Sequence, residues 1–244
     1  MHGNLCDAAF AVHDHGAGAA RLRYRTWQTP QAAAGVAVPV LLFLHGSGER
    51  GDDNRAQTRV GLGPALLRDP PPWPLLAVFP QLPAGACWSG AHANAAIAIL
   101  DDACMRAGGD RTRVALTGLS RGGYGVWELA LRWPQRFRAL VPVCGGITAP
   151  PHDAALRIAM LADAADPFAA AAARLAHLPC WLVHGARDAV VPVEQSRRTA
   201  AALQAAGAPV RYRELPEAPH NVWDAAYADP ALWRWLARAL DEEA

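Results

Sequence analysis

The sequence of 244 residues contains no lysine, because all 23 of its basic residues are arginine. This absence excludes chemistry that needs a lysine side chain, such as Schiff-base catalysis or phosphate binding by a Walker loop. Acidic residues number 22, so the formal net charge is only +1. A nearly neutral chain is not typical of a dedicated nucleic-acid or membrane-surface binder. We therefore predict neither a nucleic-acid partner nor a membrane partner.

Long hydrophobic runs are also missing. The longest, residues 32–44, is interrupted by Gly35 and Pro39 and is shorter than the roughly 18 residues that span a bilayer. Residues 1–10 have neither the basic nor the apolar region of a secretory signal. The five cysteines are odd in number, scattered and without a CxxC pair, which favours reduced thiols and a cytoplasmic location.

No cluster with the spacing of metal ligands is evident. The segment His13-Asp14-His15 is the nearest to one, but adjacent residues of an extended segment point in different directions, and no third or fourth ligand is apparent. We therefore predict no metal and no cofactor.

Short apolar segments alternate with longer amphipathic ones along the chain. Strands are predicted at residues 22–28, 40–45, 76–80, 114–117, 139–143, 180–184 and 210–214. Helices are predicted at residues 91–107, 122–133, 193–206 and 230–240. Several strands are continuously apolar, as in VPVLLFLH, which is typical of strands that are buried on both faces of a parallel sheet.

This alternation predicts an α/β fold with a doubly wound, mostly parallel sheet flanked by helices. We expect one domain over residues 1–244, since no linker or repeat divides the chain. Residues 146–177 are rich in alanine and aspartate and are less regular, so they are interpreted as a possible small insertion.

The strongest local motif is VALTGLSRGGYGVWELAL, which contains Gly118-Leu119-Ser120-Arg121-Gly122. It has the G-x-S-x-G pattern of a nucleophile elbow, placed between an apolar strand and a helix as such an elbow requires. With four serines and 21 glycines in the chain, only about 0.03 such pentapeptides are expected by chance. Ser120 is thus the candidate nucleophile.

A serine needs a base, and the base needs an acid that orients it. His220 lies in a loop between the last predicted strand and the last helix, which is where a base is expected. Asp188 follows the strand that ends CWLVHG and is the preferred acid. His184, which closes that strand, is interpreted as structural, as is His177.

Other residues compete for these two roles. The remaining histidine downstream of Ser120 is His152, and the alternative acids are Asp163, Asp166 and Asp224. Asp224 is more simply explained as an acid in the first turn of a helix.

Two backbone N–H groups are candidates for binding the oxyanion of the reaction. One belongs to Arg121, the residue after the nucleophile. The other belongs to Ser47 in the glycine-containing loop LHGSGERGDDN, whose His45 we interpret as a structural residue that fixes the loop. Trp88 and Trp223 are candidate substrate-binding residues, although ordinary packing would also explain them.

Five segments of the chain resemble the α/β-hydrolase superfamily, and more narrowly the carboxylesterase/phospholipase and dienelactone-hydrolase-like serine esterases. They are LHGSGERGDDN, FPQLPAGACWSG, TGLSRGGYGVWELALRWPQRFRALVPVCGG, LVHGARDAVVP and APHNVWDAAY, which together run from about residue 40 onward. The resemblance implies a triad of Ser120, Asp188 and His220 and oxyanion donors at Ser47 and Arg121. One departure is that dienelactone hydrolase itself has a cysteine nucleophile, where this chain has serine.

The sequence therefore predicts a serine hydrolase that cleaves small, short-chain carboxylic esters, because few residues remain to form a lid. Its partner would be a small-molecule ester. Two alternatives stay open. The same residues would serve a peptidase, thioesterase or acyltransferase, and an α/β-hydrolase fold can also act as a non-catalytic binding protein.

Overall fold

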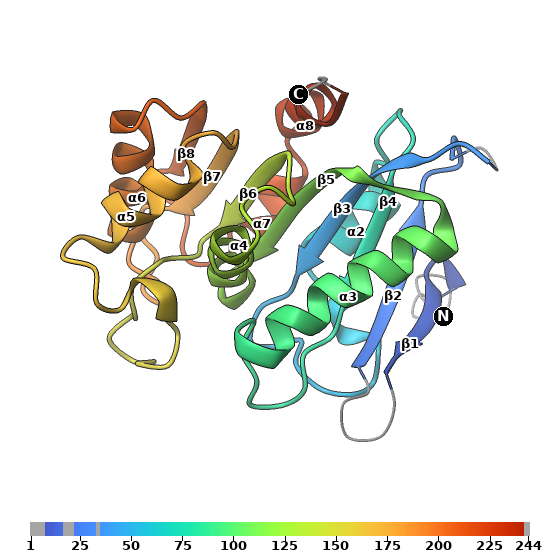
Figure 1. The fold of residues 1–244 in the computed structure, drawn as a ribbon, viewed down its shortest axis with the longest axis horizontal. Helices are drawn as coiled ribbons and strands as arrows, with labels where there is room; N and C mark the ends of the chain where they lie inside the picture. Colours follow the sequence, from blue (N-terminus) through green and yellow to red (C-terminus); the bar gives the residue numbers. More distant parts are fainter. Residues whose placement is uncertain (1–7, 17–21, 33–34, 242–244) are drawn as a thin grey trace.

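The structure is a computed structural model that describes residues 8–16, 22–32 and 35–241 (Figure 1). Eight strands form one sheet in the order β1-β2-β4-β3-β5-β6-β7-β8. Their bounds are β1 Ala11–His15, β2 Leu22–Gln28, β3 Val38–Leu44, β4 Leu76–Pro80, β5 Gly109–Leu119, β6 Ala139–Val143, β7 Cys180–Gly185 and β8 Val210–Leu215. The first two strands pair antiparallel, as do β2 and β4, and every other pair is parallel.

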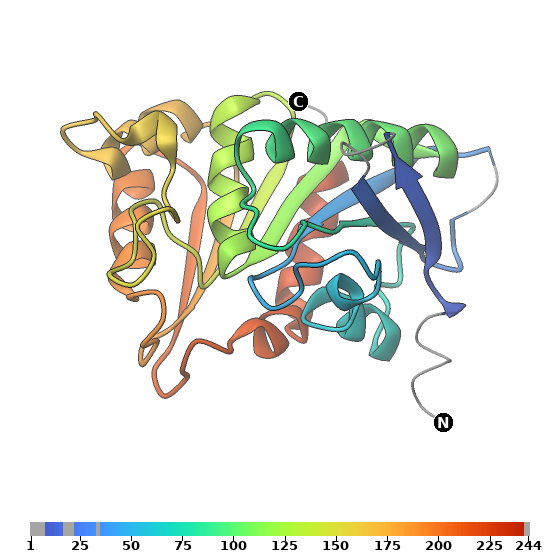
Figure 2. The ribbon, with the colours of Figure 1, turned by 90° about the horizontal axis from the view of Figure 1, so that it is seen from below.

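Helices cover both faces of this sheet (Figure 2). Their bounds are α2 Leu62–Arg68, α3 Gly90–Ala107, α4 Arg121–Arg132, α5 Pro167–Leu175, α6 Glu194–Ala205, α7 Trp223–Tyr227 and α8 Pro230–Asp241. One core lies between the sheet and α3, α4, α5 and α6, and a second lies between the sheet and α2, α7 and α8. The predicted doubly wound, mostly parallel α/β fold is confirmed.

Strand β3 shows why the strand sequences are continuously apolar. Its Val40 and Leu42 contribute to the core under α3 and α4, whereas Leu41 and Phe43 contribute to the core under α2 and α8. All four side chains are buried. Successive residues of a strand point to opposite faces, so a strand covered on both sides needs apolar residues at every position.

Several elements were not predicted. Strand β1 is an edge strand whose residues are exposed or only partly buried, so it lacks the apolar run that marks the central strands. Helices α2 and α7 have seven and five residues, which is too short for a helical period to be evident. In addition, β5 begins at Gly109, five residues before the predicted strand at 114–117. The prediction missed these residues because they are polar or glycine and only the later half of β5 is buried.

Residues 146–177 contain a short 3-10 helix, η3 (Ala159–Leu161), and helix α5. Asp166 caps α5, since its Oδ1 accepts hydrogen bonds from the N–H groups of Phe168 and Ala169. Ile158, Leu161 and Phe168 belong to the same core as α3 and α4. The irregular segment is thus attached to the central sheet through its apolar residues.

The two histidines of the segment His13-Asp14-His15, the nearest approach to a metal-binding pattern in the sequence, contact different residues. His13 stacks on Tyr24 and hydrogen-bonds Thr26, whereas His15 lies 4.0 Å from Asp102. Within the described ranges, no helix combines the length and the apolar character needed to cross a membrane.

Candidate active site

Ser120 occupies a strained turn between β5 and α4. Its backbone has φ 53° and ψ −118°, a conformation that non-glycine residues rarely adopt. A Cβ on Gly122 would lie 1.8 Å from the carbonyl oxygen of Leu44, and one on Gly118 would lie 2.5 Å from that of Gly122. Both glycines are therefore required by the close approach of β3, β5 and α4. The strain places the Ser120 hydroxyl at the carboxyl end of β5, above the N-terminus of α4.

Three side chains from different parts of the chain form a line of hydrogen bonds. Ser120 Oγ lies 2.8 Å from His220 Nε2, and His220 Nδ1 lies 2.6 Å from Asp188 Oδ2. Because a carboxylate can only accept, Nδ1 carries the hydrogen, which leaves Nε2 free to accept from the serine hydroxyl. The structure thus brings together the three residues that the sequence singled out, in the order and orientation of a nucleophile, a base and an acid.

Asp188 is held by the loop that follows β7. Its side chain is fully buried, and its Oδ1 accepts hydrogen bonds of 2.8 Å from the N–H groups of both Val190 and Val191. Burial alone would raise the pKa of this carboxyl. The hydrogen bonds from His184, His220 and Val191 outweigh burial and hold the pKa of Asp188 well below its usual range. Asp188 is therefore ionised at neutral pH.

His45 shapes the loop that follows β3. The ring is fully buried; its Nδ1 donates to the Gly46 carbonyl at 2.7 Å, and its Nε2 accepts from the Leu82 N–H at 2.9 Å. Burial is the main reason why the pKa of His45 falls to about 4. His45 is therefore neutral and joins two loops, in agreement with the structural role expected from the sequence.

The side chain of Arg121 hydrogen-bonds Ser47, the other residue predicted to bind the oxyanion. Its side chain is 7% exposed, and its Nε donates to Ser47 Oγ at 2.8 Å. Its Nη2 donates to Asp153 at 2.8 Å, and its Nη1 donates to Cys87 Sγ. One guanidinium thus links the loops after β3 and β4 to residues 146–177, and it keeps Ser47 beside the start of α4.

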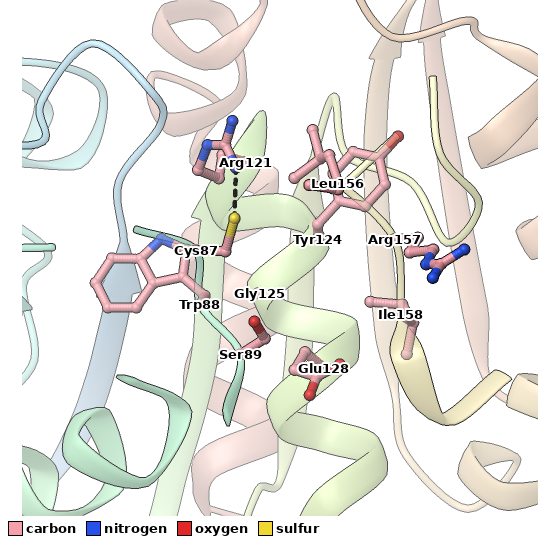
Figure 3. A pocket seen from close by; sticks show the side chains of 11 residues that line it. Cys87, Trp88, Ser89, Arg121, Tyr124, Gly125, Glu128, Leu156, Arg157 and Ile158 are labelled. Carbon is pink, nitrogen blue, oxygen red and sulfur yellow. Dashed lines mark hydrogen bonds between the residues drawn. The ribbon is translucent and has the colours of Figure 1, made fainter. Parts of the chain in front are cut away.

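A small cavity lies beside this guanidinium (Figure 3). Arg121 and Cys87 lie at one end of it, and Glu128 lies further along α4. The volume of about 20 Å³ holds little more than one water molecule. Oε1 of Glu128 accepts from Arg132, whereas its buried Oε2 has no hydrogen-bond partner within the described part of the chain.

The two candidate substrate-binding tryptophans differ in their surroundings. Trp88 is only 2% exposed, donates from Nε1 to the His45 carbonyl at 3.0 Å, and forms one wall of the cavity beside Arg121. Trp223 is partly exposed, and its ring packs edge-on against His220 at 5.7 Å. Trp223 thus contacts the candidate base directly, whereas Trp88 supports the loop of His45.

The alternative residues have other partners or none in the site. His177 Nε2 contacts the Pro134 carbonyl, and Asp224 lies in the first turn of α7. His152 and Asp163 are exposed within residues 146–177. The histidine and the carboxylate in line with Ser120 are His220 and Asp188.

Sequence reasoning did not associate His184 with the site. Its Nε2 lies 3.1 Å from Asp188 Oδ2, so the histidine that closes β7 contacts the candidate acid. The signal that could have revealed this contact is the four-residue spacing from His184 to Asp188 in HGARD, just after a buried strand.

Glu49 lies in the same loop as Ser47. Burial raises the pKa of this carboxyl, while the N–H groups of Gly46 and of Glu49 itself act in the opposite direction. Its Oε2 is buried and has no hydrogen-bond partner among the residues described. This oxygen lies close to Gly46, since a Cβ added to that glycine would be 3.1 Å from it.

Comparison with known proteins agrees with this geometry. Residues 158–243 match the model of the prolyl oligopeptidase family. A comparison with curated proteins gives no match.

Among solved structures, a thermostable esterase superposes with a TM-score of 0.79 at 27% identity, covering 96% of this chain and 64% of the esterase. Acylaminoacyl peptidase from Pyrococcus horikoshii gives a TM-score of 0.69 at 16% identity, covering 97% of this chain and 43% of that protein. Fluorophosphonate-binding serine hydrolase F from Staphylococcus aureus gives 0.66 at 15% identity, covering 96% and 99%.

The chain is therefore shorter than two of these three proteins, of which it spans 64% and 43%. In all three, almost the whole of this chain takes part in the superposition. Together with the strand order and the family match, this likeness shows that the chain has the fold of the α/β-hydrolase superfamily and is similar to its serine hydrolases.

Proposed function

We propose that the protein is a serine hydrolase that cleaves carboxylic esters with small, short acyl groups through an acyl-enzyme intermediate. The observation that carries the proposal is the hydrogen-bonded line from Ser120 through His220 to Asp188, with distances of 2.8 and 2.6 Å. A second observation in support is the similarity to a thermostable esterase, at 27% identity over 96% of this chain.

In the proposed reaction, Ser120 Oγ attacks the ester carbonyl while His220 Nε2 takes its proton. Asp188 keeps the hydrogen on Nδ1 and stabilises the imidazolium that forms. The tetrahedral intermediate collapses when His220 returns the proton to the leaving alcohol. Water, activated by the same nitrogen, then releases the acid from Ser120.

The oxyanion of each tetrahedral intermediate needs preorganised donors. We assign this role to the backbone N–H groups of Ser47 and Arg121. The bond from Arg121 Nε to Ser47 Oγ supports this assignment, because it joins the two residues directly. The N-terminus of α4, which begins at Arg121, favours the same negative charge.

The proposed preference for small substrates rests on the few residues that remain to form a lid over Ser120. Ser120 itself is partly exposed. The expected partner is a small-molecule ester, and the cytoplasmic location expected from the cysteines belongs to the same proposal.

The test is kcat/KM on p-nitrophenyl esters from acetyl to palmitoyl, with Ser120→Ala measured in parallel. We expect turnover of the shortest esters, abolished in the variant. Labelling by a fluorophosphonate probe, again lost in Ser120→Ala, separates an active hydrolase from a binding protein with the same fold. A wild-type protein that neither labels nor hydrolyses any ester would refute the proposal.

Peptidase activity is the second candidate, favoured by the prolyl oligopeptidase match over residues 158–243 and by the superposition with acylaminoacyl peptidase. The two activities use the same nucleophile and differ in the leaving group. Acyl p-nitroanilides assayed beside the matching p-nitrophenyl esters distinguish them. Faster specific turnover of the anilides, lost in Ser120→Ala, would favour the peptidase.

A further inference from the structure

His184 lies at the end of β7, and its side chain is fully buried. Its Nε2 is 3.1 Å from Asp188 Oδ2 and 2.9 Å from the carbonyl oxygen of Val191. Both of these oxygens are acceptors, so Nε2 must carry a hydrogen. On the other side of the ring, Nδ1 is 2.7 Å from Ser196 Oγ on α6. The ring is thus held at both nitrogens, and its single Nε2–H hydrogen-bonds the Val191 carbonyl while lying within 3.1 Å of the Asp188 carboxylate.

This contact completes the hydrogen bonding of Asp188. Oδ1 accepts from the N–H groups of Val190 and Val191. Oδ2 accepts from His220 at 2.6 Å, and it lies 3.1 Å from His184 Nε2, whose hydrogen it shares with the Val191 carbonyl. A carboxylate offers about four lone-pair sites, so its accepting capacity is filled by the protein alone. No part of this fully buried group depends on water for its orientation.

We infer that His184 is a positioning residue for the reaction, because its Nε2–H fixes the Asp188 oxygen that orients His220. This inference rests on the proposed function. The Ser196 hydroxyl supports it by donating to Nδ1, which keeps the hydrogen of the neutral ring on Nε2. His220 and His184 both contact the same carboxylate oxygen and so share its negative charge. Removing the His184 donor leaves more of that charge to stabilise the imidazolium of His220.

The inference predicts a change in the pH profile as well as in the rate. Without the donor, His220 becomes easier to protonate, so the acid limb of kcat/KM moves to higher pH. The value of kcat at neutral pH also falls, because Asp188 Oδ2 is no longer fixed in place.

Other charged groups near this network do not produce the same shift. Tyr124 and Cys144 face Asp188, and burial is the main reason why both have pKa values above their usual ranges. Glu214 lies opposite His184 on the neighbouring strand β8. A hydrogen bond from Arg197 is the main reason why the pKa of Glu214 is about 2. None of these three groups titrates between about pH 5 and 8. Arg187, beside Asp188 in sequence, is paired with Glu217.

Glutamine and methionine make a matched pair of replacements. They have nearly the same length and shape, but only glutamine can place an N–H group close to the position of His184 Nε2. We expect His184→Gln to keep kcat within about threefold of wild type with an unchanged acid limb. We expect His184→Met to lose about tenfold or more in kcat, with its acid limb raised by about half a pH unit.

The experiment measures kcat, KM and pH profiles of both variants on a short p-nitrophenyl ester, with thermal unfolding curves to show that each is folded. Equal kcat values and equal profiles in the two folded variants would overturn the inference. If neither folds, Ser196→Ala tests the same network from α6. That variant is expected to lose a few-fold in kcat and to raise the acid limb, and an unchanged profile would again overturn the inference.

Two controls separate this inference from the proposed function. Wild-type turnover must disappear in Ser120→Ala, and its failure to do so counts against the proposed function alone. The proton that His220 Nδ1 donates to Asp188 can be followed by NMR without any substrate. Its resonance should move in His184→Met and stay in place in His184→Gln. A resonance that stays in place in both variants would overturn the inference even if the protein were not an esterase.

Discussion

Replacing Asp188 by asparagine reverses one hydrogen bond of the site without changing its shape. Oδ1 accepts from the N–H groups of Val190 and Val191, so the amide oxygen of the asparagine must take that place. The amide nitrogen then takes the place of Oδ2, where it faces His220 Nδ1 and His184 Nε2. Because the new group donates, His220 must accept at Nδ1 and carry its hydrogen on Nε2 instead.

The magnitude follows from this change of tautomer. A His220 with hydrogen on Nε2 cannot take the proton of Ser120, although the two atoms remain 2.8 Å apart. The loss that accompanies the wrong histidine tautomer in a serine triad is about 10⁴-fold in kcat, equivalent to about 5.4 kcal/mol in activation free energy. A second cost arises because the amide nitrogen meets the N–H of His184. We expect about 1–3 kcal/mol of lost folding stability from these opposed donors.

The assay compares kcat and KM on p-nitrophenyl acetate for wild type, Asp188→Asn and Asp224→Asn. Asp224 is an exposed acid in the first turn of α7, so the same substitution there controls for the loss of a carboxylate. We expect KM of Asp188→Asn to change little, since the binding surface is intact. A kcat for Asp188→Asn within tenfold of wild type would refute the assignment of the acid and the tautomer argument with it.

Three further predictions concern the folded state and the oxyanion loops. The Arg197 hydrogen bond holds the pKa of Glu214 at about 2, below its ordinary 4.5, so its stabilising effect is present above about pH 4.5 and is lost as pH falls toward 2. Glu214→Gln should therefore lower the free energy of unfolding by about 1 kcal/mol at neutral pH and by nothing near pH 2 in urea titrations; an equal loss at both pH values would contradict this. Gly122→Ala should destabilise the folded protein by about 3 kcal/mol or more in thermal unfolding. The control Gly48→Ala, whose added Cβ meets no atom within 4 Å, should change the stability by no more than about 0.5 kcal/mol. Similar melting temperatures of the two variants would contradict the argument that the turn at Ser120 requires Gly122. Arg121→Met keeps its backbone N–H but loses the three side-chain hydrogen bonds, so kcat should fall about tenfold, and an unchanged kcat would show that the side chain does not hold the oxyanion loops.

The sequence predicted the central strands well because burial on both faces leaves an unambiguous apolar run. The predicted bounds of β2, β4 and β6 agree with the structure. The edge strand β1 was missed because exposure on an edge removes the need for apolar residues. Helices α2 and α7 were missed because so few residues show no period.

The same distinction applies to the site. Ser120, Asp188 and His220, which the structure joins by hydrogen bonds, could be proposed together because each follows a strand and because chain order and loop position restrict the choice. The contacts of Arg121 with Cys87 and Asp153 were not predictable, since they join loops that only the folded sheet brings together. The contact of His184 was missed for a different reason: its ring is buried, and a buried histidine is more often explained by packing alone.

The position of the site on the sheet divides its parts by local stability. Ser120 follows β5, which has a paired strand on each side, whereas His220 follows β8, the last strand in the sheet order. Edge strands open with less free energy than central ones. Fraying of β8 would displace His220, the proposed base, while Ser120, the proposed nucleophile, stayed in its turn. Mild heat or denaturant would then abolish turnover reversibly while most of the core remained folded. Loss of turnover would therefore indicate local unfolding at the β8 edge and not global unfolding of the domain.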